Sequence, residues 1–426
     1  MTPAARIKAS IELLERIGAS RIPMDGTIGD YMRHRRYIGA KDRADIVERT
    51  YNIVRAYARL GWWLARAGAA DTPRTRMIAW LALAEGQDAA RLFDGSEYGA
   101  EKPSEDEQKL ADSLKGEKLD HADMPDAVRV ECPPGYEDTL RAAFGNEFVG
   151  EMQAMMSGAT LDLRVNTKAV TRDEAQESLK KDGVDTDVTP YAESGLRAKG
   201  KAYLSKTKAF VKGWVEIQDE GSQLIAQVCG AQPGMQVLDY CAGGGGKTLA
   251  LAAAMKNKGR IVAMDTEKSR LEKARARFKR AGVSDIIEVR PLEDEKSRKW
   301  LKRQKGTFDV VLVDAPCSGS GTWRRNPDTR WRVYGPGLEE LVKTQEEILD
   351  KVAKTVKPGG RLVYATCSLF PVENENQVEK FLAAHPDFTA VPAEVPGAAP
   401  YMRLTPHRHN TDGFFAAILV RKSAEI

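Results

Sequence analysis

Apolar residues recur every three or four positions along the first 95 residues, which is the spacing of one buried face of an α-helix. The helices that this spacing predicts are Ala5–Ile17, Ala44–Ala67 and Arg74–Ala84. Trp62 and Trp63 fall on the second of these helices, and we expect them in the core because a small helical bundle must bury its aromatic residues. Residues 1–95 are therefore expected to form an all-helical domain.

The helical spacing stops between residues 96 and 125, where Glu, Asp, Lys, Ser and Gly dominate. Such a composition is typical of a solvated, charged linker. Residues 126–215 then mix helical spacing at Tyr136–Phe144, Glu147–Met156 and Thr171–Lys181 with strand-like runs at Leu161–Val165, Gly183–Val188 and Ala209–Ile217. Thr171 and Glu174, three residues apart, predict a capping box at the start of the third helix. This mixture predicts a small α+β subdomain, a type of fold that can present a sheet or a loop to RNA.

Short apolar runs alternate with helical stretches throughout residues 216–426. The expected strands are Val237–Asp239, Arg260–Asp265, Ile286–Val289, Asp309–Val313, Arg361–Ala365 and Phe414–Val420. The expected helices are Thr248–Met255, Ser269–Ala281, Leu338–Val356 and Glu375–Ala384. Strands that alternate with helices predict a doubly wound, mostly parallel sheet. The fold class is therefore α/β, with a Rossmann-like domain after the helical domain and the α+β subdomain.

Composition narrows the class of protein. With 426 residues, 42% of them hydrophobic and 30% charged, the chain is expected to be a soluble globular protein of two or three domains. A net charge of +4 permits a nucleic-acid partner without requiring one. Basic residues crowd the amino-terminal part at Arg33, Arg35, Arg36, Lys41, Arg43, Arg49, Arg55 and Arg59. This cluster fits RNA binding and a solvated surface equally well.

The cysteines indicate a reducing compartment. There are five, at Cys132, Cys229, Cys241, Cys317 and Cys367. No Cys-x-x-Cys pair occurs, which argues against a disulfide framework and against a structural zinc or iron–sulfur site. Charged residues interrupt any signal-peptide core, and no run approaches the ~18–20 apolar residues of a membrane helix. We expect a cytoplasmic protein with no metal and no membrane partner.

Four consecutive glycines follow the first strand of the alternating region, where Val237–Thr248 reads VLDYCAGGGGKT. Glycines let the backbone pass close to a ligand, and the start of the next helix offers free N–H groups. Gly246-Lys247-Thr248 matches the end of a phosphate-binding P-loop, but Cys241 stands where that motif needs a glycine. A tight turn without a ligand remains an alternative.

Asp265 ends the next strand, about twenty residues after the glycine run, where an acid can accept hydrogen bonds from ribose hydroxyls. Its alternative role is to cap the following helix. Together the glycine run and Asp265 predict an adenosine-containing cofactor. NAD is disfavoured because the run lacks the third glycine of a G-x-G-x-x-G motif.

Two later strands end in a cysteine followed by a serine. Asp314-Ala315-Pro316-Cys317-Ser318 follows one of them, and Thr366-Cys367-Ser368 follows the next. Because the carboxyl ends of parallel strands meet at one edge of a sheet, the two thiols and the carboxylate of Asp314 are expected to lie together. A single buried cysteine is usually inert packing, whereas two in such matched settings indicate chemistry.

These motifs resemble those of the Sun-type RNA (cytosine-5) methyltransferases. Arg164-Val165-Asn166, Gln218–Ser222 and Asp412–Phe415 add to the resemblance, which covers roughly Arg164 to the carboxyl terminus. The helical first region is similar to the NusB-like RNA-binding domain of the bacterial small-subunit ribosomal RNA members. The resemblance implies a class I methyltransferase domain over residues 216–426.

The resemblance also implies the cofactor and the site. S-adenosylmethionine is expected to bind Cys241, Ala242, Gly243, Gly244, Gly245, Gly246, Lys247, Asp265 and Asp314. Cys367 is assigned as the nucleophile that adds to carbon 6 of cytosine, Asp314 as the group that holds ring nitrogen 3, and Cys317 as the group that helps to release the product. Lys247 is expected to orient cofactor or base, and Arg270 to take part in cofactor binding.

The chain departs from the family at its glycine run, which is usually Cys-Ala-Ala-Pro-Gly-Gly-Lys. Gly243 and Gly244 replace the Ala-Pro pair, so a more flexible loop and weaker cofactor binding are expected. The family also often has an acid near the adenine after the third strand, and no residue of Val289–Asp294 can be assigned to that role.

The function expected from the resemblance is methyl transfer to carbon 5 of a cytosine in RNA by a monomeric enzyme, with small-subunit ribosomal RNA favoured by the helical domain. A tRNA substrate and a non-catalytic, RNA-binding assembly factor are the alternatives. Trp323-Arg324-Arg325 and Arg330-Trp331-Arg332 combine rings and cations that suit RNA bases and phosphates, and packing within the fold is equally compatible with them.

Overall fold

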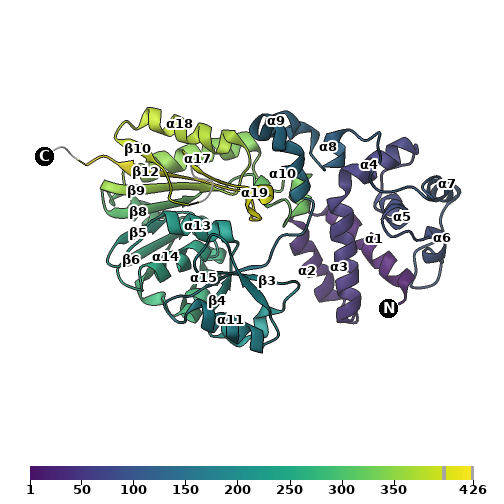
Figure 1. Ribbon diagram of the computed structural model, residues 1–426, viewed down its shortest axis with the longest axis horizontal. Helices are drawn as coiled ribbons and strands as arrows, with labels where there is room; N and C mark the ends of the chain where they lie inside the picture. Colours follow the sequence, from purple (N-terminus) through teal and green to yellow (C-terminus); the bar gives the residue numbers. More distant parts are fainter. Residues whose placement is uncertain (396–399, 424–426) are drawn as a thin grey trace. The chain divides into compact units, whose positions relative to one another are not determined.

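The computed structural model describes residues 1–395 and 400–423. The chain divides into two compact units. One unit is Met1–Gly158 with Thr322–Gly335, and the other is Ala159–Gly321 with Pro336–Ile426 (Figure 1). This grouping differs from the four parts expected from the sequence, residues 1–95, 96–125, 126–215 and 216–426.

The first unit is helical, as expected for the start of the chain. Its helices are α1 (Pro3–Ala19), α2 (Met24–His34), α3 (Ala40–Arg55), α4 (Tyr57–Arg66), α5 (Pro73–Leu83), α6 (Ala89–Leu92), α7 (Glu105–Ser113), α8 (Asp126–Arg129), α9 (Glu137–Phe144) and α10 (Phe148–Ala154). Thr2 begins α1 by accepting a hydrogen bond from Ala5 N–H, and the apolar face of α1 is buried in the core. Trp63 is buried there too, and its indole N–H donates to the carbonyl of Leu119.

Two expectations for this unit were wrong. The single helix expected over Ala44–Ala67 is broken at Ala56 into α3 and α4. Residues 96–125 are not a solvated linker. They contain α7, which has a capping box between Ser104 and Glu107, and they place Leu110, Leu114 and Met124 in the helical core.

The segment Thr322–Gly335 packs within the helical unit. Trp323 and Arg324 are each 2% exposed. Asp328 accepts a hydrogen bond from Met24 N–H at 2.8 Å, and the guanidinium of Arg330 donates to the carbonyls of Glu131 and Met155 at 3.2 and 3.1 Å. Side chains buried in this way are core residues, so of the two readings of this segment the structure supports packing rather than base stacking.

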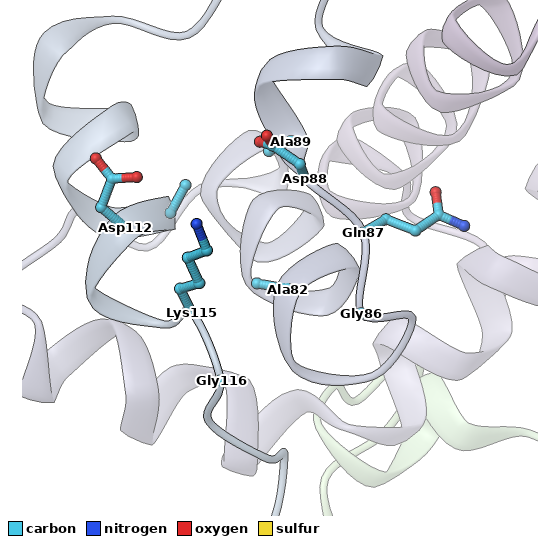
Figure 2. Close-up of a pocket in the computed structure, with 9 residues that line it drawn as sticks. Ala82, Gly86, Gln87, Asp88, Ala89, Asp112, Lys115 and Gly116 are labelled. Atoms are coloured by element: carbon cyan, nitrogen blue, oxygen red, sulfur yellow. The ribbon is translucent and has the colours of Figure 1, made fainter.

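A hollow of about 180 Å³ lies in the same unit between the start of α6 and the end of α7 (Figure 2). Asp88, Asp112 and Lys115 line it. None of the residues expected at the functional site lies here.

The second unit contains two sheets. The smaller is antiparallel, with the order β2-β3-β1-β4, and consists of β1 (Asp162–Val165), β2 (Thr186–Val188), β3 (Gly195–Ala198) and β4 (Val215–Ile217). It packs on α11 (Arg172–Lys181), whose expected capping box between Thr171 and Glu174 is present. The strand expected over Ala209–Ile217 was wrong in its first half, because Lys208–Val211 forms α12.

The larger sheet has the order β10-β12-β9-β8-β5-β6-β7, with β11 paired to β12. Its strands are β5 (Gln236–Asp239), β6 (Arg260–Asp265), β7 (Ile287–Pro291), β8 (Phe308–Asp314), β9 (Val356–Thr366), β10 (Phe388–Val391), β11 (Met402–Leu404) and β12 (Phe414–Arg421). Strands β5 to β9 pair in parallel, whereas β12 runs antiparallel to β9. The α/β fold class and the mostly parallel sheet are confirmed.

Helices cover both faces of this sheet (Figure 1). They are α13 (Glu220–Val228), α14 (Gly246–Ala254), α15 (Lys268–Ala281), α16 (Glu295–Lys302), α17 (Leu338–Ala353) and α18 (Glu375–Ala384), followed by the short α19 (Pro406–His409). One core contains Val237, Ile261, Val310 and Val363. The opposite core contains their neighbours Leu238, Val262, Val311 and Leu362. Burial on both faces explains why these strands are apolar without alternation.

The strand order reverses at β5, which has β6 on one side and β8 on the other. In open α/β sheets this reversal opens a crevice at the carboxyl ends of the strands, where ligands bind. The glycine run follows β5, Asp314 ends β8 and Cys367 follows β9, so the expected site residues gather at this edge. Among the described residues, no helix has both the length and the apolar run that crossing a bilayer requires.

Candidate active site

The loop between β5 and α14 requires its glycines. Gly243 and Gly245 adopt left-handed backbone conformations, with φ of +53° and +78°. A Cβ atom at Gly245 would lie 2.5 Å from the ring of Phe278 and 3.0 Å from the Cβ of Ala274. Because α14 begins at Gly246, unpaired N–H groups of its first turn face this loop. A glycine loop packed closely on α15, beside a helix start, fits the expected S-adenosylmethionine.

Two side chains fix the backbone of this loop. The carboxylate of Asp265 accepts hydrogen bonds from Gly243 N–H at 2.7 Å and from Glu267 N–H at 2.8 Å. The guanidinium of Arg277 donates to the carbonyl of Gly244. The loosening expected from Gly243 and Gly244 is therefore opposed by direct contacts. Arg270 lies close by, because a Cβ at Gly243 would be 2.6 Å from its guanidinium.

A cavity of about 690 Å³ opens beside the ends of β5, β6 and β7. Tyr240, Thr266, Leu292 and Leu301 are among the residues that line it. Leu292 directly follows β7 and contributes an apolar side chain to this cavity. The amide of Leu292 donates to the carbonyl of Asp265 at 2.8 Å, which joins this position to the end of β6.

Lys247 and Asp314 form an ion pair of 2.7 Å at the end of β8. Burial lowers the pKa of Lys247, but the carboxylate of Asp314 outweighs burial and leaves that pKa above its usual value. Lys247 therefore stays protonated at neutral pH, and its charge also acts on Cys367. The expected catalytic carboxylate and the last residue of the glycine run are thus direct partners.

The thiols of Cys317 and Cys367 lie 3.5 Å apart. They meet because β8 and β9 are parallel neighbours, with Asp314 beside Ala365 in the register. The hydrogen bond between Cys317 and Cys367 and burial raise the pKa of Cys317 well above its usual value. Both cysteines are only partly buried. One edge of the sheet therefore holds two thiols next to an ammonium and a carboxylate.

Comparison with known proteins agrees with this geometry. Residues 226–420 match the family model described as 16S rRNA methyltransferase RsmB/F, and residues 136–203 match the ferredoxin-like domain of RsmF/B-like methyltransferases. The chain is 33% identical over 297 residues to ribosomal RNA small subunit methyltransferase B of Vibrio cholerae, across 70% of this chain and 67% of that protein. This chain belongs to the RsmB/F family.

Two further similarities show how far the likeness extends. The probable ribosomal RNA small subunit methyltransferase B of Synechocystis is 36% identical over 269 residues, which span 61% of this chain and 60% of that relative. The crystal structure of PH0851 superposes with a TM-score of 0.78 at 28% identity, across 98% of this chain and 99% of that one. Membership of the family confirms the Sun-type recognition, the fold class and S-adenosylmethionine as the cofactor.

The structure of this RsmB/F family member contains a carboxylate that the sequence analysis missed. Glu373 is fully buried and connects the two cysteine loops. It accepts hydrogen bonds from the N–H of Ser318 at 2.8 Å, the hydroxyl of Ser318 at 2.6 Å, the hydroxyl of Ser368, and the amide of Gln345 at 3.0 Å. Its neighbour Asn374 donates to the carbonyl of Ser368 at 2.9 Å.

Asp239 is a second ionisable group that the sequence analysis missed. It is fully buried at the end of β5, and burial raises the pKa of its carboxyl to about 7. The hydroxyl of Thr248 donates to one of its oxygens at 2.6 Å, whereas the other oxygen has no hydrogen-bond partner within the described ranges. Burial also raises the pKa of the neighbouring Cys241 well above its usual value, which makes that thiol unreactive at neutral pH.

Proposed function

We propose that this RsmB/F family member transfers a methyl group from S-adenosylmethionine to carbon 5 of a cytosine in small-subunit ribosomal RNA. The observation that carries the proposal is the pair of thiols 3.5 Å apart beside the Lys247–Asp314 ion pair. Carbon 5 of cytosine is a poor nucleophile. A thiol that adds to carbon 6 makes carbon 5 nucleophilic. A second thiol can then help to reverse the addition.

Cys367 begins the reaction by forming a bond to carbon 6, and the displaced electron pair moves towards carbon 5. Lys247 supplies positive charge next to this nucleophile. Asp314, through a proton that it shares with Lys247, can hydrogen-bond ring nitrogen 3, and the ammonium of Lys247 stabilises the negative charge that develops there. S-adenosylmethionine supplies the electrophilic methyl group that carbon 5 takes.

Cys317 acts in the second half of the reaction. Its pKa is raised chiefly by the hydrogen bond and the charge of Cys367 together with burial. Once Cys367 is bonded to carbon, that charge is gone, so Cys317 can lose its proton to solvent. The thiolate of Cys317 then takes the proton from carbon 5, and the bond between Cys367 and carbon 6 breaks.

The names of the relatives and the length of the sequence similarity favour small-subunit ribosomal RNA as the substrate. Both curated relatives described above are named as small-subunit ribosomal RNA methyltransferases. The target base must leave its stack to reach a site at the edge of a sheet, which requires an accessible segment of RNA. We propose that the protein acts as a monomer in the cytoplasm.

The test is methyl transfer with purified protein, labelled S-adenosylmethionine and unmodified small-subunit ribosomal RNA. Label recovered as 5-methylcytosine at a defined position supports the proposal. Transfer only to tRNA would mean that tRNA, and not ribosomal RNA, is the substrate. The absence of both a thermal shift with S-adenosylhomocysteine and transfer to either RNA would overturn the catalytic role and leave an RNA-binding factor.

A further inference from the structure

Glu373 occupies the space between the two cysteine loops, although it lies 55 residues from Ser318 along the chain. Each cysteine is followed by a serine, and both serine hydroxyls reach the same carboxylate. The amide of Gly321 adds a direct bond to the carbonyl of Cys367 at 2.9 Å. The carboxylate of Glu373 therefore joins the two cysteine loops through side-chain contacts, in addition to this backbone hydrogen bond.

The contacts of Glu373 match an ionised carboxylate. Its four contacts are donors: one backbone N–H, one side-chain amide and two hydroxyls that can turn their protons towards it. Within residues 1–395 and 400–423, no lysine or arginine forms an ion pair with it. A buried, unpaired negative charge is costly and is tolerated only when its oxygens are well hydrogen-bonded, as here.

This charge acts on Cys317. The charge of Glu373 contributes to the raised pKa of Cys317, after the hydrogen bond with Cys367, burial and the charge of Cys367. Lys247 acts on Cys367 instead. The other ionisable groups around the pair are Asp314, Tyr364 and Cys241, and burial raises the pKa values of Tyr364 and Cys241 well above their usual ranges. One thiol thus faces an anion and the other faces a cation.

We propose that Glu373 is a positioning residue that joins the two cysteine loops and keeps the proton shared by the thiols on Cys317, which leaves Cys367 free to attack. The inference rests on the proposed function for its catalytic meaning. Its physical content, the unequal protonation of two adjacent thiols, is a property of the protein alone.

The experiment measures alkylation of each cysteine by iodoacetamide across a pH series, with peptide mass spectrometry to separate Cys317 from Cys367. In the parent protein, Cys367 should react at the lower pH. In Glu373→Gln, which keeps the size and removes the charge, the pH midpoints of the two cysteines should approach each other by at least ~1 unit, a tenfold change in relative reactivity. Glu379→Gln, on the exposed face of α18, is the matched control and should keep the parent pattern.

Methyl transfer gives the second readout. Glu373→Gln should lower kcat at least ~tenfold with little change in KM for RNA, and Glu373→Asp, which keeps the charge, should restore the order of alkylation. Thermal unfolding and S-adenosylhomocysteine binding report whether each variant is folded. If Glu373→Gln does not fold, the parent protein and Glu373→Asp still decide the matter.

The inference is overturned if Cys317 reacts first in the parent protein, or if folded Glu373→Gln keeps the parent separation between the two cysteines. Alkylation requires no RNA, so the two proposals can fail separately. If the cysteines are alkylated in the expected order but no methyl transfer occurs, only the proposed function is contradicted. If methyl transfer occurs without that order, only the role of Glu373 is contradicted.

Discussion

Asp239 links the charge state of a single buried residue to the stability of the fold. The pKa of its carboxyl is raised from 3.8 to about 7, chiefly by burial, so the folded state favours the neutral acid. A raised pKa in the folded state gives stability that is fully present below the unfolded pKa and is lost as the pH rises through about 7. The difference of about three pKa units is worth roughly 4 kcal/mol.

Asp239→Asn should therefore flatten the pH dependence of stability. Asparagine cannot ionise and still accepts the hydrogen bond from Thr248, so the variant should gain stability relative to the parent at pH 8 and gain less than half as much at pH 5. The midpoint of thermal unfolding at both pH values measures this. Asp309→Asn is the control, and its effect on stability should have the opposite sign. The reason is that the Gln236 amide and Lys357 lower the pKa of Asp309 in spite of burial. Parallel pH profiles for parent protein and Asp239→Asn would contradict the assignment.

At the residue scale, the sequence identified Asp314, Cys317, Cys367 and Lys247 because each belongs to a short motif whose chemistry is local. The structure brings these four together. Glu373 belongs to no such motif. Its importance arises from its hydrogen bonds with Ser318 and Gln345, which lie 55 and 28 residues away. A contact of that kind exists only after the sheet has formed.

At the element scale, the glycine run behaves as one unit with α14 and α15. Gly245→Ala should disrupt it, because an alanine at φ +78° is strained and its Cβ would overlap the ring of Phe278. We expect the affinity for S-adenosylhomocysteine to fall at least ~tenfold, or about 1.4 kcal/mol, in calorimetric titration.

Gly244→Ala is the matched control, because Gly244 does not have a left-handed backbone and its added Cβ would come no closer than 3.3 Å to another side chain, the guanidinium of Arg277. Its affinity should stay within ~threefold of the parent, less than 1 kcal/mol. Equal losses in the two variants would show that the conformation of Gly245 does not shape the cofactor loop.

The boundary between α3 and α4 shows why some elements were not predictable. Nothing in the local spacing interrupts the helix expected over Ala44–Ala67. The break at Ala56 is stabilised by Glu131, whose carboxylate accepts hydrogen bonds from the N–H groups of Ala58 and Arg59 at 2.7 and 3.3 Å. The group that caps α4 thus lies 73 residues along the chain, whereas the local capping box at Thr171 was correctly predicted.

At the scale of the whole molecule, the chain is not divided where its composition changes. Residues 96–125 are polar on average, but a few buried apolar residues, Ala100, Leu110, Leu114 and Met124, pack them on the helical core. Thr322–Gly335 follows the Cys317 loop directly and yet folds with the helical unit. Composition averages over a window, whereas packing depends on the few side chains that face the core.

Arg330→Ala tests whether Thr322–Gly335 is part of the helical core. The change leaves a cavity and two buried carbonyls without their donor, so the free energy of unfolding should fall by about 2–4 kcal/mol in denaturant titration. Arg36→Ala, at an exposed position of the same unit, should stay within ~0.5 kcal/mol of the parent. A loss no larger than that of the control would mean that Arg330 does not hold the segment in place.

The most direct test of the central claim compares Cys317→Ala with Cys367→Ala in the presence of S-adenosylmethionine and small-subunit ribosomal RNA, on a denaturing gel. Cys317→Ala should accumulate a covalent protein–RNA adduct, because Cys367 still attacks and release is blocked. Cys367→Ala should form neither adduct nor methylated RNA. Equal methyl transfer by the two variants, or an adduct in Cys367→Ala, would contradict the roles assigned to the two thiols.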